Sequence, residues 1–159
     1  MRVCPSFENV SVLVIGDVML DRFWAGATHR VSPEAPVPVV KVADCHNRAG
    51  GAGNVAVNIA SLGARAKLAG LCGEDEAAQS LRAAVESAGV QWAVTPCGAE
   101  TIVKLRVLSR NQQLLRMDFE GSLEQYADDL FLGWLTTLLV DIDVVVLSDY
   151  GKGTLNRVA

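Results

Sequence analysis

The sequence lacks the cysteine pattern of a disulfide scaffold or a zinc site. Its four cysteines (Cys4, Cys45, Cys72 and Cys97) are scattered over 159 residues, and no two of them form a C-x-x-C pair. Scattered cysteines are typical of reduced thiols that pack in a cytoplasmic protein. Cys45-His46 has no second pair with which to complete a metal site, so we expect no bound metal.

Excess positive charge and long apolar runs are also missing. The chain carries 14 Lys and Arg against 18 Asp and Glu, a net charge of −4, whereas a general nucleic-acid binder needs a basic face. No apolar run approaches membrane-spanning length, and the N-terminus has no signal-peptide pattern. The G-x-x-x-x-G-K-[ST] motif of P-loop proteins is absent. We therefore expect neither a nucleic-acid nor a membrane partner.

The composition that is present indicates a globular domain with a substantial core. Half of the residues are hydrophobic and 20% are charged. Short β-branched runs alternate with helical patterns, which predicts an α/β fold with a mostly parallel sheet flanked by helices. The expected strands are 10–16, 66–71, 91–94 and 144–147, and the expected helices are 55–62, 76–88 and 123–139. The pattern of a further helix begins at Thr154 and the chain stops at Ala159, so we expect an incomplete sheet whose last strand, 144–147, has an unpaired edge.

Two segments without a helix between them predict a small antiparallel β-lid. Residues 22–28 and 37–42 flank a proline cluster at 33–38, and proline suits edge strands. Phe23 and Trp24 then belong either to the core of the lid or to an exposed contact face. Since exposed aromatics on a small sheet often mark a partner surface, we hypothesise that the lid also forms a homodimer.

A glycine-rich loop precedes the first predicted helix. Gly50, Gly51 and Gly53 let the backbone approach a ligand closely, and the first helical turn offers free N–H groups. Asn54 stands where a helix N-cap is expected, and Gly63 where the helix should end. The loop is a candidate site for an oxygen-rich small molecule, and the alternative is a tight loop before an ordinary core helix.

Charged residues supply the other candidate site positions. Asp17 and Asp21 follow the first strand, where open α/β sheets bind ligands, although a loop carboxylate exposed to solvent is the alternative. Lys104 and Arg106 share one face of a hairpin formed by 102–109 and 112–117 around Arg110-Asn111. Two cations on one face can hold a phosphate, while the alternative is a sheet edge guarded by charge.

A dinucleotide site is a further interpretation of the same loop. Gly51-x-Gly53-x-x-Ala56 matches the dinucleotide fingerprint, with Glu74 about twenty residues on. That fingerprint needs a strand running into its first glycine, and residues 44–48 are polar and unlike a strand. An NAD-dependent oxidoreductase is therefore the least favoured function.

Several motifs resemble the ribokinase-like (PfkB) carbohydrate kinases. They are Gly16-Asp17-Val18-Met19-Leu20-Asp21, the glycine loop with Asn54, and Asn58-Ile59-Ala60-Ser61-Leu62-Gly63. Residues 32–40, 104–113 and 147–153 more closely resemble the kinase domain of bifunctional heptose 7-phosphate kinase/heptose 1-phosphate adenylyltransferases. The resemblance covers nearly the whole chain and implies a ribokinase-like α/β fold with a β-lid.

The resemblance also implies an activity and a substrate site. ATP with Mg²⁺ would phosphorylate D-glycero-β-D-manno-heptose 7-phosphate at its anomeric hydroxyl, toward ADP-heptose for the lipopolysaccharide core. Asp21 and Asn54, with the backbone of Gly50 and Gly51, would bind sugar hydroxyls. Asp17 is a secondary candidate. From charge and spacing we assign Lys104 and Arg106 to the 7-phosphate.

The resemblance is incomplete at the catalytic centre. In the family the catalytic base is an aspartate after a later Gly-Ala-Gly turn, whereas Gly51-Ala52-Gly53-Asn54 lies too early and ends in an amide that cannot accept a proton. The loop is also one residue shorter than in many of these kinases. We expect 1–159 to be the sugar-binding and lid half, with the base, the ATP-binding half and the adenylyltransferase domain beyond Ala159. Alone, the chain should bind no ATP or Mg²⁺ and be inactive. The alternatives are a non-catalytic sugar-phosphate-binding module and a PfkB-type kinase for another sugar.

Overall fold

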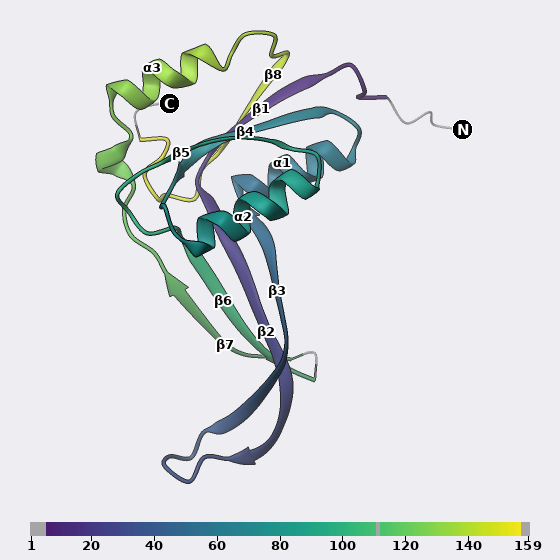
Figure 1. The fold of residues 1–159 in the computed structure, drawn as a ribbon, viewed down its shortest axis with the longest axis vertical. Helices are drawn as coiled ribbons and strands as arrows, with labels where there is room; N and C mark the ends of the chain where they lie inside the picture. Colours follow the sequence, from purple (N-terminus) through teal and green to yellow (C-terminus); the bar gives the residue numbers. More distant parts are fainter. Residues whose placement is uncertain (1–5, 111, 157–159) are drawn as a thin grey trace.

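The computed structural model describes residues 6–110 and 112–156 and arranges them around two four-stranded β-sheets (Figure 1). The parallel sheet has the spatial order β5 (Gln91–Pro96), β4 (Arg65–Cys72), β1 (Ser11–Gly16) and β8 (Val144–Ser148). The lid sheet has the order β3 (Pro38–Gly51), β2 (Val18–Val31), β6 (Val103–Ser109) and β7 (Gln112–Phe119). The helical segments are α1 (Ala52–Ser61), α2 (Glu76–Ser87), the 3₁₀ turn η1 (Glu124–Tyr126) and α3 (Asp129–Thr137).

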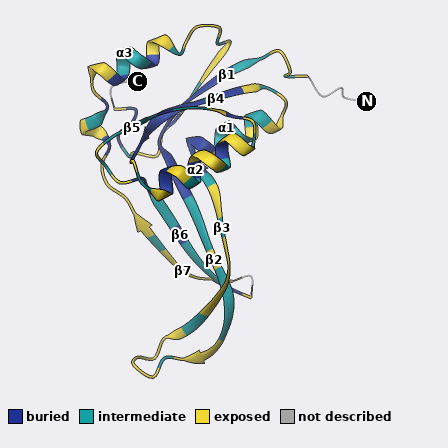
Figure 2. Cartoon of the chain, viewed as in Figure 1, coloured by how far each residue is buried: buried dark blue, intermediate teal, exposed yellow. Residues whose placement is uncertain are grey.

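The parallel sheet confirms the predicted α/β class and its four predicted strands. β1 is a continuous apolar strand because helices cover both of its faces. Val12 and Val14 pack with α1 and α2 on one face, while Leu13 and Ile15 pack with α3 on the other. Figure 2 shows α1 and α2 on one side of the parallel sheet and α3 on the opposite side. The edge of β8 is open among the described residues, as predicted, and half-exposed valines lie along it.

The lid is longer than predicted. β2 and β3 are each 14 residues long and form an antiparallel hairpin that extends away from the helices (Figure 1). The statement that residues 44–48 are not a strand was wrong, because their polar side chains are tolerated on a half-exposed sheet that pairs with β2 along its length. β3 nevertheless lies in the lid sheet and runs antiparallel to β2, whereas the dinucleotide fingerprint requires a strand of the central parallel sheet.

The first helix begins earlier than predicted. α1 starts at Ala52 with Gly51 as its N-cap, so Asn54 is the third helical residue and the N-cap assignment was wrong. The reason is the backbone of Gly51, whose φ of +54° turns the chain directly from β3 into the helix. Gly63, with φ of +94°, ends the helix as predicted.

The predicted helix 123–139 is divided into two parts. Ala127 has a non-helical ψ of 57°, and Asp128 then caps α3 by accepting the N–H of Phe131 at 2.9 Å. Because Asp128 is an N-cap, a new helix begins after it and the predicted helix 123–139 is interrupted there. The hairpin of β6 and β7 is confirmed by its antiparallel pairing, although Asn111 of its turn lies outside the described residues.

The described cysteines form no disulfide bonds. Cys45, Cys72 and Cys97 are free, and burial raises the pKa of the Cys72 thiol to about 12. Cys4 lies outside the described residues. In residues 6–110 and 112–156 no helix is long and apolar enough to cross a bilayer.

Candidate substrate site

Asp17 lies at the junction of the two sheets and is completely buried. Its Oδ2 accepts the N–H groups of Tyr150 at 2.9 Å and Lys152 at 3.0 Å, and its Oδ1 accepts the N–H of Thr154 at 3.2 Å. Its carbonyl oxygen accepts the N–H of Ala52 at 2.9 Å. Asp17 therefore joins the loop after β8 to the first turn of α1, and its carboxylate is occupied by backbone.

Asp21 lies on β2 between Arg48 of β3 and Lys104 of β6. Arg106 donates a hydrogen bond of 2.6 Å to its Oδ1. A Cβ placed on Gly50 would stand 2.9 Å from Asp21 Oδ2. Any residue larger than glycine at position 50 would therefore displace this carboxylate. The structure thus places two of the predicted site residues, Asp21 and Gly50, beside each other on the lid sheet.

The rest of the glycine loop lies next to this contact. Gly51 follows Gly50, and a Cβ on it would stand 2.3 Å from the carbonyl oxygen of Asp17. Asn54 is exposed in the first turn of α1, where backbone N–H groups have no helical partner. Gly50, Gly51 and Gly53 are buried, so the exposed polar side chain at this corner is that of Asn54.

Lys104 and Arg106 share a face of the lid sheet, as their spacing predicted. Lys104 Nζ lies 3.0 Å from Asp118 Oδ2 and 3.1 Å from Glu120 Oε2. Burial lowers the pKa of Lys104, but the hydrogen bonds and charges of these two carboxylates outweigh burial and leave the pKa raised. The hydrogen bond from Lys104 in turn lowers the pKa of Asp118. Both predicted phosphate ligands are therefore paired with internal carboxylates.

An aromatic cluster that the sequence analysis missed lies on the same face. The ring of Phe23 stacks on His46 with centroids 5.0 Å apart. The guanidinium carbons of Arg106 and Arg48 lie 5.2 and 5.4 Å from its centroid, within the range of cation–π attraction. If residues 44–48 had been predicted as a strand, the period-two alternation of side chains would have placed His46 and Arg48 on the same face as Gly50.

These side chains define the charged face of the lid sheet. Its members share a face because they pair across β3, β2, β6 and β7: Asp21, Phe23, His46, Arg48, Lys104, Arg106, Arg116 and Asp118. The face combines one carboxylate beside a glycine with several cations and an aromatic ring. Such a surface can bind hydroxyl groups and a phosphate in one ligand.

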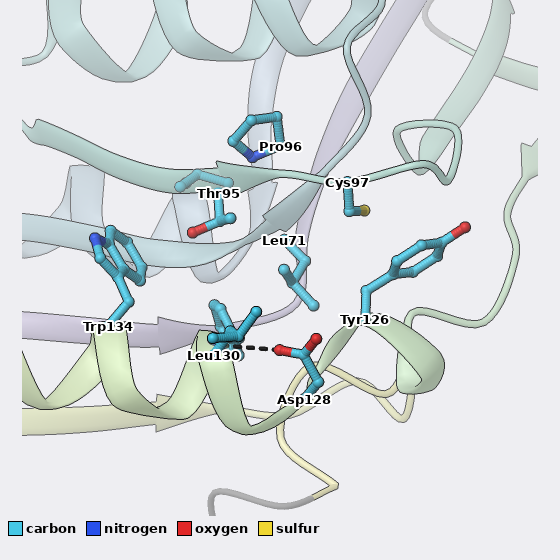
Figure 3. A pocket seen from close by; sticks show the side chains of 10 residues that line it. Leu71, Thr95, Pro96, Cys97, Tyr126, Asp128, Leu130 and Trp134 are labelled. Atoms are coloured by element: carbon cyan, nitrogen blue, oxygen red, sulfur yellow. Dashed lines mark hydrogen bonds between the residues drawn. The ribbon is translucent and has the colours of Figure 1, made fainter.

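A mainly apolar hollow lies elsewhere on the molecule. This cavity of about 590 Å³ opens between β5 and α3 and is lined by Leu71, Thr95, Cys97, Tyr126, Leu130 and Trp134 among others (Figure 3). Asp128 at its rim already caps α3. None of the predicted substrate residues lines this hollow, so it is separate from the charged face of the lid sheet.

Magnesium binds to several oxygen ligands at once. Within the described ranges, no group of three or more His, Cys, Asp or Glu side chains is arranged to hold a metal ion.

Comparison with known proteins agrees with this architecture. The family model described as pfkB family carbohydrate kinase matches residues 9–155. The chain is 52% identical over 157 residues to "Bifunctional protein HldE" of Shewanella amazonensis, covering 98% of this chain and 33% of the relative. It is 54% identical over 155 residues to the protein of the same name from Shewanella sp. (strain ANA-3), covering 96% of this chain and 32% of that relative. The chain thus spans about a third of the length of these curated relatives.

Solved structures show the same fold at low identity. A carbohydrate kinase from Agrobacterium tumefaciens has a TM-score of 0.65 at 16% identity, over 87% of this chain and 45% of that one. The Arabidopsis thaliana ribokinase complexed with ribose and ATP has a TM-score of 0.61 at 16% identity, over the same shares of the two chains. The described residues therefore have a ribokinase-like α/β fold.

Proposed function

The chain belongs to the pfkB family of carbohydrate kinases, and on that premise we propose that it binds the sugar substrate of a heptose 7-phosphate kinase. In this proposal ATP phosphorylates D-glycero-β-D-manno-heptose 7-phosphate at its anomeric hydroxyl. The single observation that carries the proposal is Asp21, which is held against Gly50 on a sheet face that also carries Lys104 and Arg106. The heptose-type motifs at 32–40, 104–113 and 147–153 support this choice of sugar.

Asp21 with its partner Arg106, the glycine loop with Asn54, and Asp17 have separate roles in this proposal. Asp21 accepts hydrogen bonds from sugar hydroxyls, and Arg106 orients its carboxylate through a charge-assisted hydrogen bond. The backbone of Gly50 and Gly51 permits close approach of the sugar, and Asn54 offers an amide from the first turn of α1. Asp17 contributes indirectly, since its carboxylate holds the loop after β8.

We assign no catalytic base to this chain. The amide of Asn54 cannot take the proton of the anomeric hydroxyl, so the base and the ATP–Mg²⁺ site would belong to the remainder of a longer kinase. The one-third coverage of the HldE relatives supports that arrangement, with 1–159 as the sugar-binding and lid half and an adenylyltransferase domain further on. The product would serve ADP-heptose synthesis for lipopolysaccharide in the cytoplasm, where free thiols such as Cys45 and Cys72 persist.

Calorimetric titration with heptose 7-phosphate tests this function. We expect the chain to bind the sugar phosphate but not NAD, and to show no ATP-dependent turnover alone. Asp21→Ala should weaken binding about 100-fold, because two hydrogen bonds to a charged group contribute about 3 kcal/mol together. Asp21→Asn keeps a hydrogen-bond acceptor for Arg106 and should leave the fold intact. Weaker sugar binding by this variant would therefore reflect the lost carboxylate and not a loss of folding.

The matched control for Asp21 is Glu86→Gln on α2, whose partner is Arg82. It removes one negative charge away from the charged face and should leave the affinity for the sugar unchanged. Equal affinity of wild type and Asp21→Ala would remove Asp21 from the site. Phosphorylation by the purified chain would contradict the assignment of the base to another segment.

We also propose that the lid forms a homodimer. Exposed apolar side chains lie along the hairpin of β2 and β3, at Trp24, Val31, Val37 and Val42. Light scattering should report twice the mass of the chain, and Val42→Asp should shift the mass toward that of a monomer because it places a charge in the apolar contact. Leu62→Asp, at the end of α1, is the control, and a strict monomer for the unmodified chain would refute the lid contact.

A further inference from the structure

Glu120 bridges two lysines, one on a strand of the lid sheet and one in the loop after β8 of the parallel sheet. Its Oε1 lies 2.7 Å from Nζ of Lys152, in the loop after β8, and its Oε2 lies 3.1 Å from Nζ of Lys104, on β6 of the lid sheet. Each carboxylate oxygen therefore takes one ammonium group. Both lysines pair with Glu120, and Lys104 also pairs with Asp118 at 3.0 Å. Glu120 thereby joins the lid sheet to the loop after β8 of the parallel sheet.

Both lysines are firmly positioned. The N–H of Lys152 donates to the buried carboxylate of Asp17 at 3.0 Å, and its carbonyl accepts the N–H of Leu123 at 2.7 Å. Lys104 is fixed by strand pairing with β2 and β7. The side chains of Lys104 and Lys152 are only 15% and 22% exposed, so this is a built pair of cations and not a loose surface contact.

The positive charge around Glu120 can be balanced by an anion that carries more negative charge than a carboxylate. Asp118 is held by Arg116, whose Nε lies 2.9 Å from Asp118 Oδ1, and by Lys104, whose Nζ lies 3.0 Å from Asp118 Oδ2. Together, Lys104, Lys152 and Arg116 carry one more charge than Asp118 and Glu120 balance. Hydrogen bonds from Lys152 and then Lys104 lower the pKa of Glu120, so its carboxylate is ionised. A carboxylate brings one negative charge and two oxygens to the two lysines, whereas a phosphoryl group brings three oxygens and a charge near −1.5 to −2. A phosphoryl group therefore satisfies the lysine pair better than Glu120 does.

The lysine pair also lies within reach of a sugar held by Asp21. Asp21 and Lys104 are direct partners in the parallel pairing of β2 and β6, and neighbouring strands lie about 4.8 Å apart. A seven-carbon sugar is longer than that spacing, so one molecule can place a hydroxyl at Asp21 and its phosphate near Lys104. The carboxylate of Glu120 then occupies the position that the phosphate needs.

We propose that the phosphate of the sugar displaces Glu120 from between Lys104 and Lys152, so that Lys152 is a specificity-determining residue and Glu120 an internal competitor. This inference rests on the proposed function and deepens it. A sugar without a phosphate has no group that can replace Glu120, so the cluster selects phosphorylated sugars. Binding of the phosphate also ties a strand of the lid sheet to the loop held by Asp17.

Titration of the full chain with heptose 7-phosphate, fructose 6-phosphate, unphosphorylated heptose and inorganic phosphate tests the proposal. Lys152→Met should weaken heptose 7-phosphate binding about 10- to 100-fold, the range for one hydrogen bond between charged groups, and leave heptose unchanged. Glu120→Gln should tighten heptose 7-phosphate binding several-fold and also leave heptose unchanged. Lys152→Arg should retain most of the affinity, and Lys41→Met, an exposed lysine of the lid hairpin, is the matched control.

The outcomes separate this inference from the proposed function. If wild type binds heptose 7-phosphate and Lys152→Met binds it equally well, the lysine pair is refuted while the function stands. An equal loss for phosphorylated and unphosphorylated heptose would make Lys152 a structural residue, and weaker binding by Glu120→Gln would make Glu120 a ligand rather than a competitor. If fructose 6-phosphate, but not heptose 7-phosphate, binds in a Lys152-dependent way, the substrate assignment fails and the lysine pair stands. If the chain binds none of these phosphates, both the proposed function and the role of the lysine pair are refuted.

Discussion

Asp17→Ala is expected to lower the free energy of unfolding by at least about 3 kcal/mol, as measured by urea denaturation followed by circular dichroism. The substitution leaves the N–H groups of Tyr150, Lys152 and Thr154 without their acceptor in a site where Asp17 is fully buried. A hydrogen bond to a charged group contributes about 1.5–3 kcal/mol, and buried donors without partners add the cost of desolvation. Even partial relaxation of the loop leaves a large loss.

The control for Asp17 lies in the same loop. Asp149 accepts the N–H of Gly151 at 2.8 Å with an exposed carboxylate, so water can replace the lost acceptor in Asp149→Ala. That variant should lose no more than about 1 kcal/mol. A similar small loss for Asp17→Ala would show that the loop finds other acceptors, and that Asp17 does not hold the two sheets together.

Gly51→Ala is expected to destabilise the chain by about 3 kcal/mol or more, as measured by thermal unfolding. Gly51 has φ of +54° and ψ of −133°, a combination that L-residues avoid at a cost of about 1–3 kcal/mol. The added Cβ would also stand 2.3 Å from the carbonyl oxygen of Asp17, which already accepts the N–H of Ala52. Either β3 or the start of α1 must move, so sugar binding should fall together with stability.

A second glycine gives a control of opposite sign. Gly133 lies inside α3 without a positive φ, and a Cβ added to it would meet no atom within 4 Å. Gly133→Ala should therefore stabilise the chain by up to about 1 kcal/mol through helix propensity. If Gly51→Ala unfolded at the temperature of wild type, the turn from β3 into α1 would be more adaptable than its backbone geometry indicates.

Local pattern was sufficient for the elements of the parallel sheet. The strands at 10–16 and 66–71 were predictable because burial on both faces requires a continuous apolar run. The β6–β7 hairpin was predictable from two short runs around a two-residue turn. The lid hairpin was predicted too short, because residues 44–48 are polar on a sheet that is largely open to solvent, and polarity there resembles a loop.

The order of residues along the chain was enough for the α/β class, the presence of a lid, the family resemblance and the identities of the charged candidates. The partners of those candidates depended on the folded arrangement. Asp21 accepts a hydrogen bond from Arg106, which is 85 residues away in the sequence. Asp17 accepts the N–H of Tyr150 from 133 residues away, and Glu120 accepts a hydrogen bond from Lys152 from 32 residues away. The physical reason is that strand order and register choose which side chains face each other, and no local periodicity records that choice.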